Sequence, residues 1–406
     1  MKILMLTPYL PYPTSSGGQI RSYNLIKNLA KTNEITLFSL IKREEERKYV
    51  GELEKYCKKV MVFKRPNKPW TLKNILRTGF SKYPFLVIRN LSPEERQAVT
   101  EELEKENYDL VHAETFYVMP HIPQIKTPII LVDQTIEFQV YQHFVESPGK
   151  SIWKSLLKPL LYLDVYKIKF WELKFWQKAS RVIAVSQADK EKMLSFDKSL
   201  EVDVVPNGAG EDLMAVWQKR IPEKDPTIFF QANYDWMQNV EAAENLARKV
   251  FPIIKKRVPN AQCWIVGQGA LAKLANLQTP GLKIIDLDNS DMQGVVEAYR
   301  RATIFVAPLE GPGGTRLKIL AAMAAGVPVV TTSVGIEGIE AEEGKEVLIA
   351  DSWAEIAEKT ILLIKDNKIY QGLANAARKL VEEKYSYQSI AKTLEKIYRE
   401  VASGRN

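Results

Sequence analysis

Short apolar segments alternate with helical segments along almost all of this chain, and this alternation limits the possible folds more than any other feature. In the first half, strands are predicted at residues 2–6, 35–40, 60–63, 110–112, 129–132, 182–185 and 202–205. A second series is predicted at residues 228–230, 262–266, 283–285, 304–307, 327–331 and 347–349. Helical periodicity lies between the strands, as in residues 18–30, 93–105 and 152–178. Strands joined through helices pair in parallel, so the sequence predicts an α/β fold with parallel sheets.

The chain is long enough for two domains. Its 406 residues suit two cores of about 200 residues each better than one. A turn at 206–208 and a charged, proline-bounded connection at 222–226 mark the expected boundary. We expect a Rossmann-like domain over residues 1–208, joined by the C-terminal helix 387–406, and a second one over residues 221–384. Two doubly wound domains facing a cleft bind ligands at the carboxyl ends of their strands.

Composition excludes several classes of protein. The chain is 46% hydrophobic and 26% charged, which is ordinary for a globular protein. Cys57 and Cys263 are its two cysteines, and Cys263 lies in a predicted buried strand, so we expect a reducing compartment and no disulfide. No run approaches the roughly 18 apolar residues of a membrane-spanning helix, and the N-terminus is interpreted as a core strand, so a cytoplasmic location is expected. HExxH, paired CxxC and DxD motifs are absent, so no metal site is predicted.

The net charge of +8 indicates either an anionic partner or a basic solvated surface. Two segments, residues 64–89 and 150–181, interleave lysine and arginine with aromatic residues. This mixture suits peripheral contact with the inner face of a membrane. The same pattern fits an amphipathic core helix with a basic outer face, which is the commoner use of such periodicity. Nucleic-acid binding is not predicted, because no RRM or KH signature is present.

One loop has the composition of an anion site. Residues 307–339 read APLEGPGGTRLKILAAMAAGVPVVTTSVGIEGI, in which a predicted strand leads through Gly313 and Gly314 into a helix. Glycines let backbone N–H groups crowd an anion, and a helix N-terminus adds partial positive charge. Arg316 and Lys318 in the first turn oppose the helix dipole unless an anion is bound. These donors together suit a pyrophosphate better than a single carboxylate.

This loop resembles the nucleotide-sugar loop of family 4 of the retaining GT-B glycosyltransferases, in the variant with the signature GGTRxKxLEAMAxGxPVV. The likeness covers most of the chain. Further segments that resemble the family, in the same order, are TPYLPYPTSSGGQIRSYNLIKNLA, DLVHAETFY, VVPNG, FFQANYDWMQNVEAAENL and WIVGQG. The resemblance implies the GT-B fold, in which two Rossmann-like domains face a cleft.

The resemblance also implies roles for particular residues. Donor binding is implied for Gly17, Gly18, Asn233, Trp236, Gly267, Gly313, Gly314, Thr315, Arg316 and Lys318. Arg316 and Lys318 would stabilise the leaving nucleoside diphosphate in place of a metal. His112 and Glu137 would position the donor sugar or the acceptor, and Glu114 is placed similarly at a strand end. A single histidine at a strand end is also commonly a polar residue with ordinary partners.

The chain departs from the family at Ala321, where the signature has glutamate. That glutamate accepts hydrogen bonds from the nucleotide ribose, and alanine cannot. Losing a charged partner costs about 1.5–3 kcal/mol, which is roughly tenfold to a hundredfold in affinity. Three explanations stay open: Glu337 compensates, the alanine is a mutation, or the protein is a weakened or non-catalytic relative.

The expected function is transfer of a sugar from a UDP- or GDP-sugar to a hydroxyl of a glycan or lipid-linked acceptor, with retention and without a cofactor. Ala321 motivates one alternative, a non-catalytic GT-B relative that binds a glycan or serves as a partner subunit. A dinucleotide-dependent oxidoreductase is the weaker alternative, because Gly267 and Gly269 lack the third glycine of GxGxxG.

Overall fold

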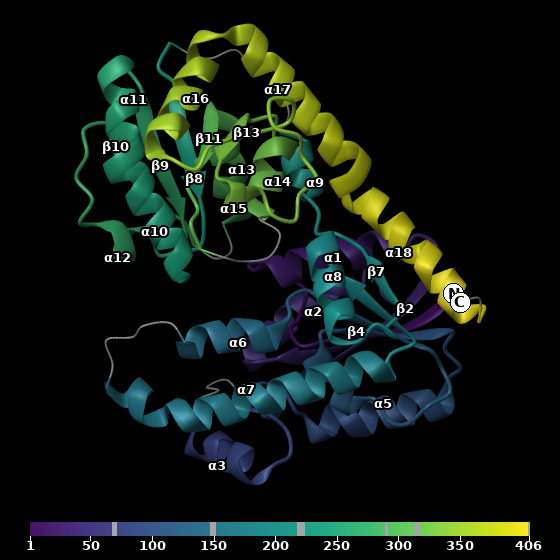
Figure 1. Cartoon of the computed structure of the whole chain (residues 1–406). Coiled ribbons are helices and arrows are strands. Elements are labelled where there is room, and N and C mark those ends of the chain that lie inside the picture. Colours follow the sequence, from purple (N-terminus) through teal and green to yellow (C-terminus); the bar gives the residue numbers. More distant parts are fainter. Residues whose placement is uncertain (67–70, 147–151, 217–223, 289–290, 312–316, 405–406) are drawn as a thin grey trace. The chain divides into compact units, whose positions relative to one another are not determined.

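The computed structural model describes residues 1–66, 71–146, 152–216, 224–288, 291–311 and 317–404 (Figure 1). The chain divides into two compact units. Unit 1 contains Met1–Val205 and Ala391–Asn406, and unit 2 contains Pro206–Ile390. The last helix, α18 (Tyr387–Ala402), begins in unit 2 and ends in unit 1.

Unit 1 is built on a parallel sheet, which has seven strands in the described residues, in the order β3-β2-β1-β4-β5-β6-β7. The strands are β1 (Lys2–Thr7), β2 (Glu34–Ile41), β3 (Lys59–Lys64), β4 (Leu110–Glu114), β5 (Ile129–Asp133), β6 (Arg181–Ala184) and β7 (Val202–Val204). The helices are α1 (Gly17–Leu29), α2 (Val50–Leu53), α3 (Leu72–Phe80), α4 (Phe85–Ile88), α5 (Pro93–Lys105), α6 (Glu137–Glu146), α7 (Ile152–Lys178) and α8 (Gln187–Phe196). Two 3₁₀ helices cover Glu44–Tyr49 and Phe116–His121.

The strand order of unit 1 reverses between β1 and β4, which pair with each other in parallel. Both strands are almost wholly buried, as expected of a parallel sheet that is covered by helices on both faces. In their register Met5 lies beside His112 and Leu6 beside Ala113. Ligands of doubly wound sheets bind where the order reverses, at the carboxyl ends of the strands. In unit 1 that place follows Thr7 and Glu114.

Unit 2 has a second parallel sheet, which has six strands in the described residues, in the order β10-β9-β8-β11-β12-β13. The strands are β8 (Thr227–Gln231), β9 (Gln262–Gly267), β10 (Leu282–Asp286), β11 (Ile304–Ala307), β12 (Val329–Thr331) and β13 (Leu348–Ile349). The helices are α9 (Glu211–Met214), α10 (Met237–Asn245), α11 (Phe251–Arg257), α12 (Ala270–Leu274), α13 (Met292–Arg301), α14 (Leu317–Ala324), α15 (Ser333–Ile336), α16 (Trp353–Lys365) and α17 (Asn367–Leu380). Two π-helical turns, Leu246–Val250 and Val381–Tyr385, continue α10 and α17.

The strand order of unit 2 reverses between β8 and β11, which are also paired in parallel. Its core is formed by apolar side chains of the sheet and of the helices that cover it, such as Phe229, Phe305 and Tyr299, whose rings contact one another. The corresponding ligand position follows Gln231 and Ala307.

The predicted fold class is confirmed, since both halves of the chain form doubly wound parallel sheets. The long helix predicted at residues 152–178 has those bounds in the structure. The sequence pattern assigned no range to the shorter helices of unit 1, which are α2, α3, α4, α6 and α8 and have ten residues or fewer. Both cysteines are free and buried. Among the described residues, no helix combines the length and the apolar character needed to cross a bilayer.

Candidate functional site

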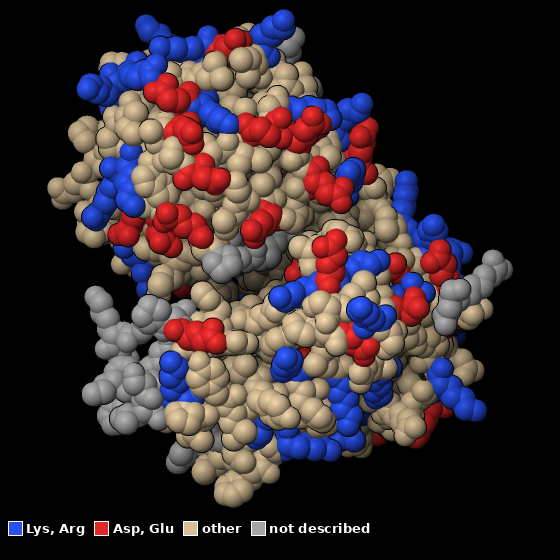
Figure 2. All heavy atoms as spheres, viewed as in Figure 1, with Lys and Arg blue, Asp and Glu red and all other residues tan. Residues whose placement is uncertain are grey.

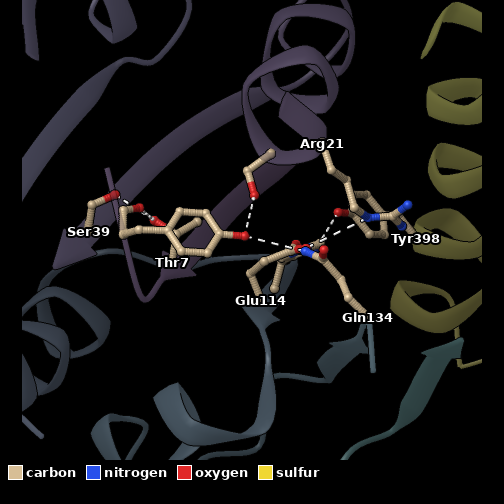
Figure 3. A network of polar contacts seen from close by, with 9 residues as sticks. Thr7, Arg21, Ser39, Glu114, Gln134 and Tyr398 are labelled. Atoms are coloured by element: carbon tan, nitrogen blue, oxygen red, sulfur yellow. Dashed lines mark hydrogen bonds and ion pairs between the residues drawn. The ribbon is translucent and has the colours of Figure 1, made fainter. Parts of the chain in front are cut away.

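His112 lies in β4, and both of its ring nitrogens have protein partners. Nδ1 is hydrogen-bonded to the hydroxyl of Tyr398 in α18, and Nε2 lies 2.7 Å from Oε2 of Glu114. All three side chains are buried. Figure 3 shows Glu114 and Tyr398 within this network. The imidazole is therefore fixed from two sides, and neither nitrogen is open to a substrate in this conformation.

Glu114 accepts hydrogen bonds at both carboxylate oxygens and also faces a buried cation. Nε2 of Gln134 donates to its Oε1 at 2.6 Å, and Nε of Arg21 lies 3.7 Å from the same oxygen (Figure 3). Burial by itself would raise the pKa of Glu114, but the His112 hydrogen bond, Arg21 and Gln134 hold that pKa below its ordinary value. Glu114 is therefore ionised at neutral pH.

The ionised carboxylate and the tyrosine hydroxyl assign the hydrogen-bond roles of the two ring nitrogens of His112. Because Glu114 can only accept, Nε2 of His112 carries a proton and donates it. Burial raises the pKa of Tyr398 well above its ordinary value, so its hydroxyl keeps its proton. With Nε2–H donating to Glu114 and Nδ1 accepting from the Tyr398 hydroxyl, each of these three groups has a hydrogen-bond partner.

Gly18 lies beside this network. A Cβ at this position would lie 2.4 Å from the hydroxyl oxygen of Tyr9, so only glycine leaves room for that ring. The Tyr9 hydroxyl in turn lies 3.3 Å from Oγ of Ser22 and accepts from Nε2 of Gln134 at 3.3 Å. Gly17 is the first residue of the same helix, α1. The predicted glycine loop thus borders the end of β4 in unit 1.

Glu137 lies after the neighbouring strand β5, at the first residue of α6. Its backbone N–H donates to Oε1 of Glu172 at 2.8 Å, so it belongs to a different hydrogen-bonded group from Glu114. Burial raises the pKa of the Glu137 carboxyl to about 7, and the Arg89 guanidinium acts in the opposite direction. This carboxyl can therefore gain or lose a proton near neutral pH, as a general acid or base must.

In unit 2, Asn233 follows β8 and organises the loop there. Its Oδ1 accepts from the backbone N–H of Asp235 at 2.8 Å, and its Nδ2 donates to Oε1 of Gln268 at 2.8 Å. Trp236 precedes α10 with 61% of its surface exposed. A large exposed indole at the carboxyl edge of a parallel sheet is available to contact a planar ligand.

Gly267 ends the neighbouring strand β9 and has a φ of +140°. A Cβ here would lie 1.8 Å from the carbonyl oxygen of Ala232, which would force the two backbones apart. The glycine predicted from its place in the WIVGQG segment is therefore required by the close approach of these two loops.

Lys318 lies in the first turn of α14 and is linked to the Asn233 loop through α10. Its Nζ donates to Oδ1 of Asn239 and lies 5.2 Å from the centre of the Phe230 ring. Nδ2 of Asn239 donates in turn to the backbone carbonyl of Asn233 at 2.7 Å. Two predicted donor-binding residues, Asn233 and Lys318, are thus brought together at the carboxyl end of β8.

The remaining predicted donor residues, Gly313, Gly314, Thr315 and Arg316, lie outside the described residues. Ala321 is described and is 8% exposed, one turn beyond Lys318 on α14. Among the residues that the structure describes, no group of three or more histidine, cysteine, aspartate or glutamate side chains is arranged to hold a metal ion.

Sequence reasoning did not identify Tyr398, Tyr9 or Asn239 as members of these networks. Tyr398 lies 286 residues after His112, and nothing in its local sequence distinguishes it from the other apolar positions of α18. Asn239 was within the quoted segment FFQANYDWMQNVEAAENL. Its asparagine in the first turn of a helix was the available signal.

Both halves of the chain match families of glycosyltransferases. Residues 15–212 match the family described as Glycosyltransferase Family 4, and residues 225–366 match Glycosyl transferases group 1. The chain is also similar to an uncharacterized 44.6 kDa protein in the cps region of Klebsiella pneumoniae. The two are 23% identical over 411 residues, which covers 96% of this chain and 97% of that relative.

Two solved structures resemble the whole chain at low identity. Sucrose-phosphate synthase from Thermosynechococcus elongatus has a TM-score of 0.68 and 15% identity, covering 100% of both chains. Anabaena Alr3699/HepE, solved in complex with UDP, has a TM-score of 0.63 and 17% identity, covering 98% of this chain and 100% of its own. These likenesses concern the fold, and they confirm the GT-B architecture predicted from the sequence.

Proposed function

We propose that this chain, a glycosyltransferase of the GT-B fold, moves a sugar from a UDP- or GDP-sugar to a hydroxyl of a glycan or lipid-linked acceptor, with retention of configuration. The match of both halves to glycosyltransferase families carries this proposal. A role in cell-surface polysaccharide or glycoconjugate synthesis is supported by the cps-region name of the Klebsiella pneumoniae relative. A lipid-linked acceptor would bring the protein to a membrane surface.

Unit 2 would hold the nucleoside diphosphate. Lys318 and Asn233 are joined through Asn239 where the strand order reverses, which is the general ligand position of such sheets. As the bond to the sugar breaks, negative charge accumulates on the diphosphate leaving group. Lys318, Arg316 and backbone N–H groups at Gly313 and Gly314 would stabilise that charge without a metal.

Unit 1 would supply groups for the sugar and the acceptor. His112 acts as a positioning residue in this proposal, because both ring nitrogens are occupied and one of them orients Glu114. Glu137 would exchange a proton with the reacting hydroxyl, since its pKa lies at about 7.

Nucleotide binding by the full chain tests the proposal. Titration calorimetry should detect UDP or GDP, and Lys318→Ala should weaken that affinity about tenfold through loss of a charged hydrogen-bond donor. Lys256→Ala serves as the matched control, because Lys256 is an exposed lysine of α11 in the same unit and should leave affinity unchanged. Absence of binding to UDP, GDP and ADP would contradict the proposal.

Ala321 favours a second candidate, a non-catalytic relative that binds a glycan or partners an active transferase. Because alanine offers no acceptor to a ribose hydroxyl, nucleotide affinity is expected to be reduced. Hydrolysis of UDP- and GDP-sugars separates the two candidates. Nucleotide binding without turnover, in this chain and in Ala321→Glu alike, would support the non-catalytic one.

A further inference from the structure

Three helices of unit 1 expose most of the large apolar side chains that are strongly exposed in the described part of the chain. On α7 the exposed side chains are Leu157, Leu160, Tyr162, Leu163, Tyr166 and Phe170. The neighbouring helices add Leu76 and Phe80 from α3, and Val140 and Phe144 from α6. Tyr166 is 68% exposed and Phe80 is 92% exposed. We call the exposed residues of α3 and α7 the apolar face. Isolated surface leucines are ordinary, but a group of this kind marks an interaction surface.

The helix α7 is apolar on two opposite sides. Val165, Ile168 and Trp176 are buried against the rest of unit 1. Leu163, Tyr166 and Phe170 follow at spacings of three and four residues, so they share a different side, which is exposed. A surface helix that only covers its own core would place polar residues on that outer side. The prediction of a core helix with a basic outer face therefore describes only half of α7.

The C-terminal end of α3 and the middle of α7 form one continuous surface. Nζ of Lys167 donates to the carbonyls of Thr78 and Ser81 at 2.9 and 2.8 Å. Nε1 of Trp171 donates to the carbonyl of Lys82 at 2.8 Å, and its ring lies 4.5 Å from that of Tyr83. These bonds fix Phe80, at the end of α3, beside the middle of α7.

The charges of α7 are sorted by side. Its two carboxylates in the described part point inward, where Asp164 accepts from the backbone N–H of Phe85 at 2.9 Å and Glu172 accepts from that of Glu137 at 2.8 Å. Lys158 and Lys174, in contrast, are exposed, and their Nζ atoms each lie 5.8 Å from the centre of a ring of the apolar face, Tyr162 and Phe170 respectively. In Figure 2 the surface over α7 and α3 is mostly tan with scattered blue side chains. The face is thus apolar and cationic at once.

We propose that the apolar face of α3 and α7 docks on an anionic lipid surface. Exposed leucines and aromatic rings enter the boundary between headgroups and acyl chains, while surrounding lysines meet lipid phosphates. A second copy of this chain fits less well, because a twofold contact would set the same lysines against each other. The inference draws on the proposed function only in expecting a lipid-linked acceptor, and it is tested without any donor.

Flotation of the full chain with vesicles tests the inference. Binding is expected to vesicles of phosphatidylcholine mixed with phosphatidylglycerol, and much weaker binding to phosphatidylcholine alone, because the lysines need anionic headgroups. The double variant Leu163→Gln with Tyr166→Gln should reduce partitioning about tenfold or more, since two exposed apolar side chains are lost. Lys158→Glu with Lys174→Glu should remove the preference for phosphatidylglycerol.

The matched control is Leu271→Gln with Leu362→Gln, which changes two exposed leucines of unit 2 and should leave vesicle binding unchanged. Calorimetric UDP or GDP binding by every variant should equal that of the original chain, so a failed vesicle test is separable from a failed glycosyltransferase proposal. The inference is overturned if the original chain does not float with phosphatidylglycerol vesicles. It is also overturned if the Leu163 and Leu271 double variants lose binding equally. Light scattering that shows a dimer abolished by the Leu163 double variant, without vesicle binding, would assign the face to self-association instead.

Discussion

Replacing Glu114 by glutamine should destabilise unit 1 far more than the loss of one surface ion pair. The carboxylate accepts from His112 at 2.7 Å and from Gln134 at 2.6 Å, and it lies beside the buried Arg21. A glutamine places an NH₂ group where one oxygen was. In either orientation this new donor faces a donor on His112 or Gln134.

The burial of both side chains determines which magnitude applies. Removing one partner of a buried ion pair costs about 3–5 kcal/mol, because the remaining charge stays buried after it has lost its opposite charge. That cost is a large part of the roughly 5–15 kcal/mol that stabilises a typical domain. The matched control is Glu34→Gln in the same unit, whose 2.8 Å pair with Lys58 is exposed on both sides. An exposed pair contributes about 0–1 kcal/mol.

Urea unfolding, followed by circular dichroism and by tryptophan fluorescence, measures the difference. Trp176 is buried in unit 1 with its indole N–H on Asp133, so its emission reports on that unit. Because the folded pKa of Glu114 is below its ordinary value, its stabilisation is present above the unfolded pKa and is lost as pH falls through the folded pKa. The gap between the original chain and Glu114→Gln should therefore shrink in acid. Equal unfolding free energies of Glu114→Gln and Glu34→Gln at pH 7 would refute this account of the network.

Three further predictions concern the proposed site. The rate of donor turnover should rise through about pH 7 as the Glu137 carboxyl loses its proton, and Glu137→Gln should remove that rise. If the pH–rate profile of Glu137→Gln equals that of the original chain, Glu137 is excluded as the group that exchanges the proton. Ala321→Glu should raise turnover of UDP- or GDP-sugars by restoring an acceptor for the ribose, and it should cost about 1–3 kcal/mol of stability because the residue is only 8% exposed. Unchanged turnover in an active transferase would contradict this role. Gly267→Ala should lower the melting temperature strongly, because its Cβ would lie 1.8 Å from a backbone oxygen, whereas Gly372→Ala, in an open position of α17, should stabilise the protein slightly. Similar melting temperatures of the two variants would count against the close approach of the loops.

Much of the fold could be predicted from local patterns. Buried parallel strands are nearly continuous apolar runs, so β1, β4 and β11 were predicted within two residues of their observed ends. The bounds of α7 were predicted for the same reason, since its apolar residues recur without a break. The short helices α3 and α6 received no range from the sequence, because fewer than three turns give a short window in which to recognise a helical period.

The candidate site could be predicted in part. Asn233 follows β8 and Lys318 follows β11, the two strands between which the order of the sheet reverses, so their grouping follows from the order of elements. Gly267 ends β9, the other neighbour of β8. The occupied ring of His112 could not be predicted in this way. Its partner Tyr398 comes from the last helix, and hydrogen-bond partners so far apart in the chain depend on how the helix packs onto the sheet.

The sequence by itself determined the class of fold and the edge of each sheet at which ligands of such folds bind. Periodicity contains that information because burial and backbone conformation act on each residue locally. Only the tertiary structure decided which groups meet. It set His112 between Glu114 and Tyr398, linked Lys318 to Asn233 through Asn239, and left the outer side of α7 uncovered. An apolar residue has the same pattern whether a neighbouring element covers it or not, so the exposed face of α7 is visible only once the chain is folded.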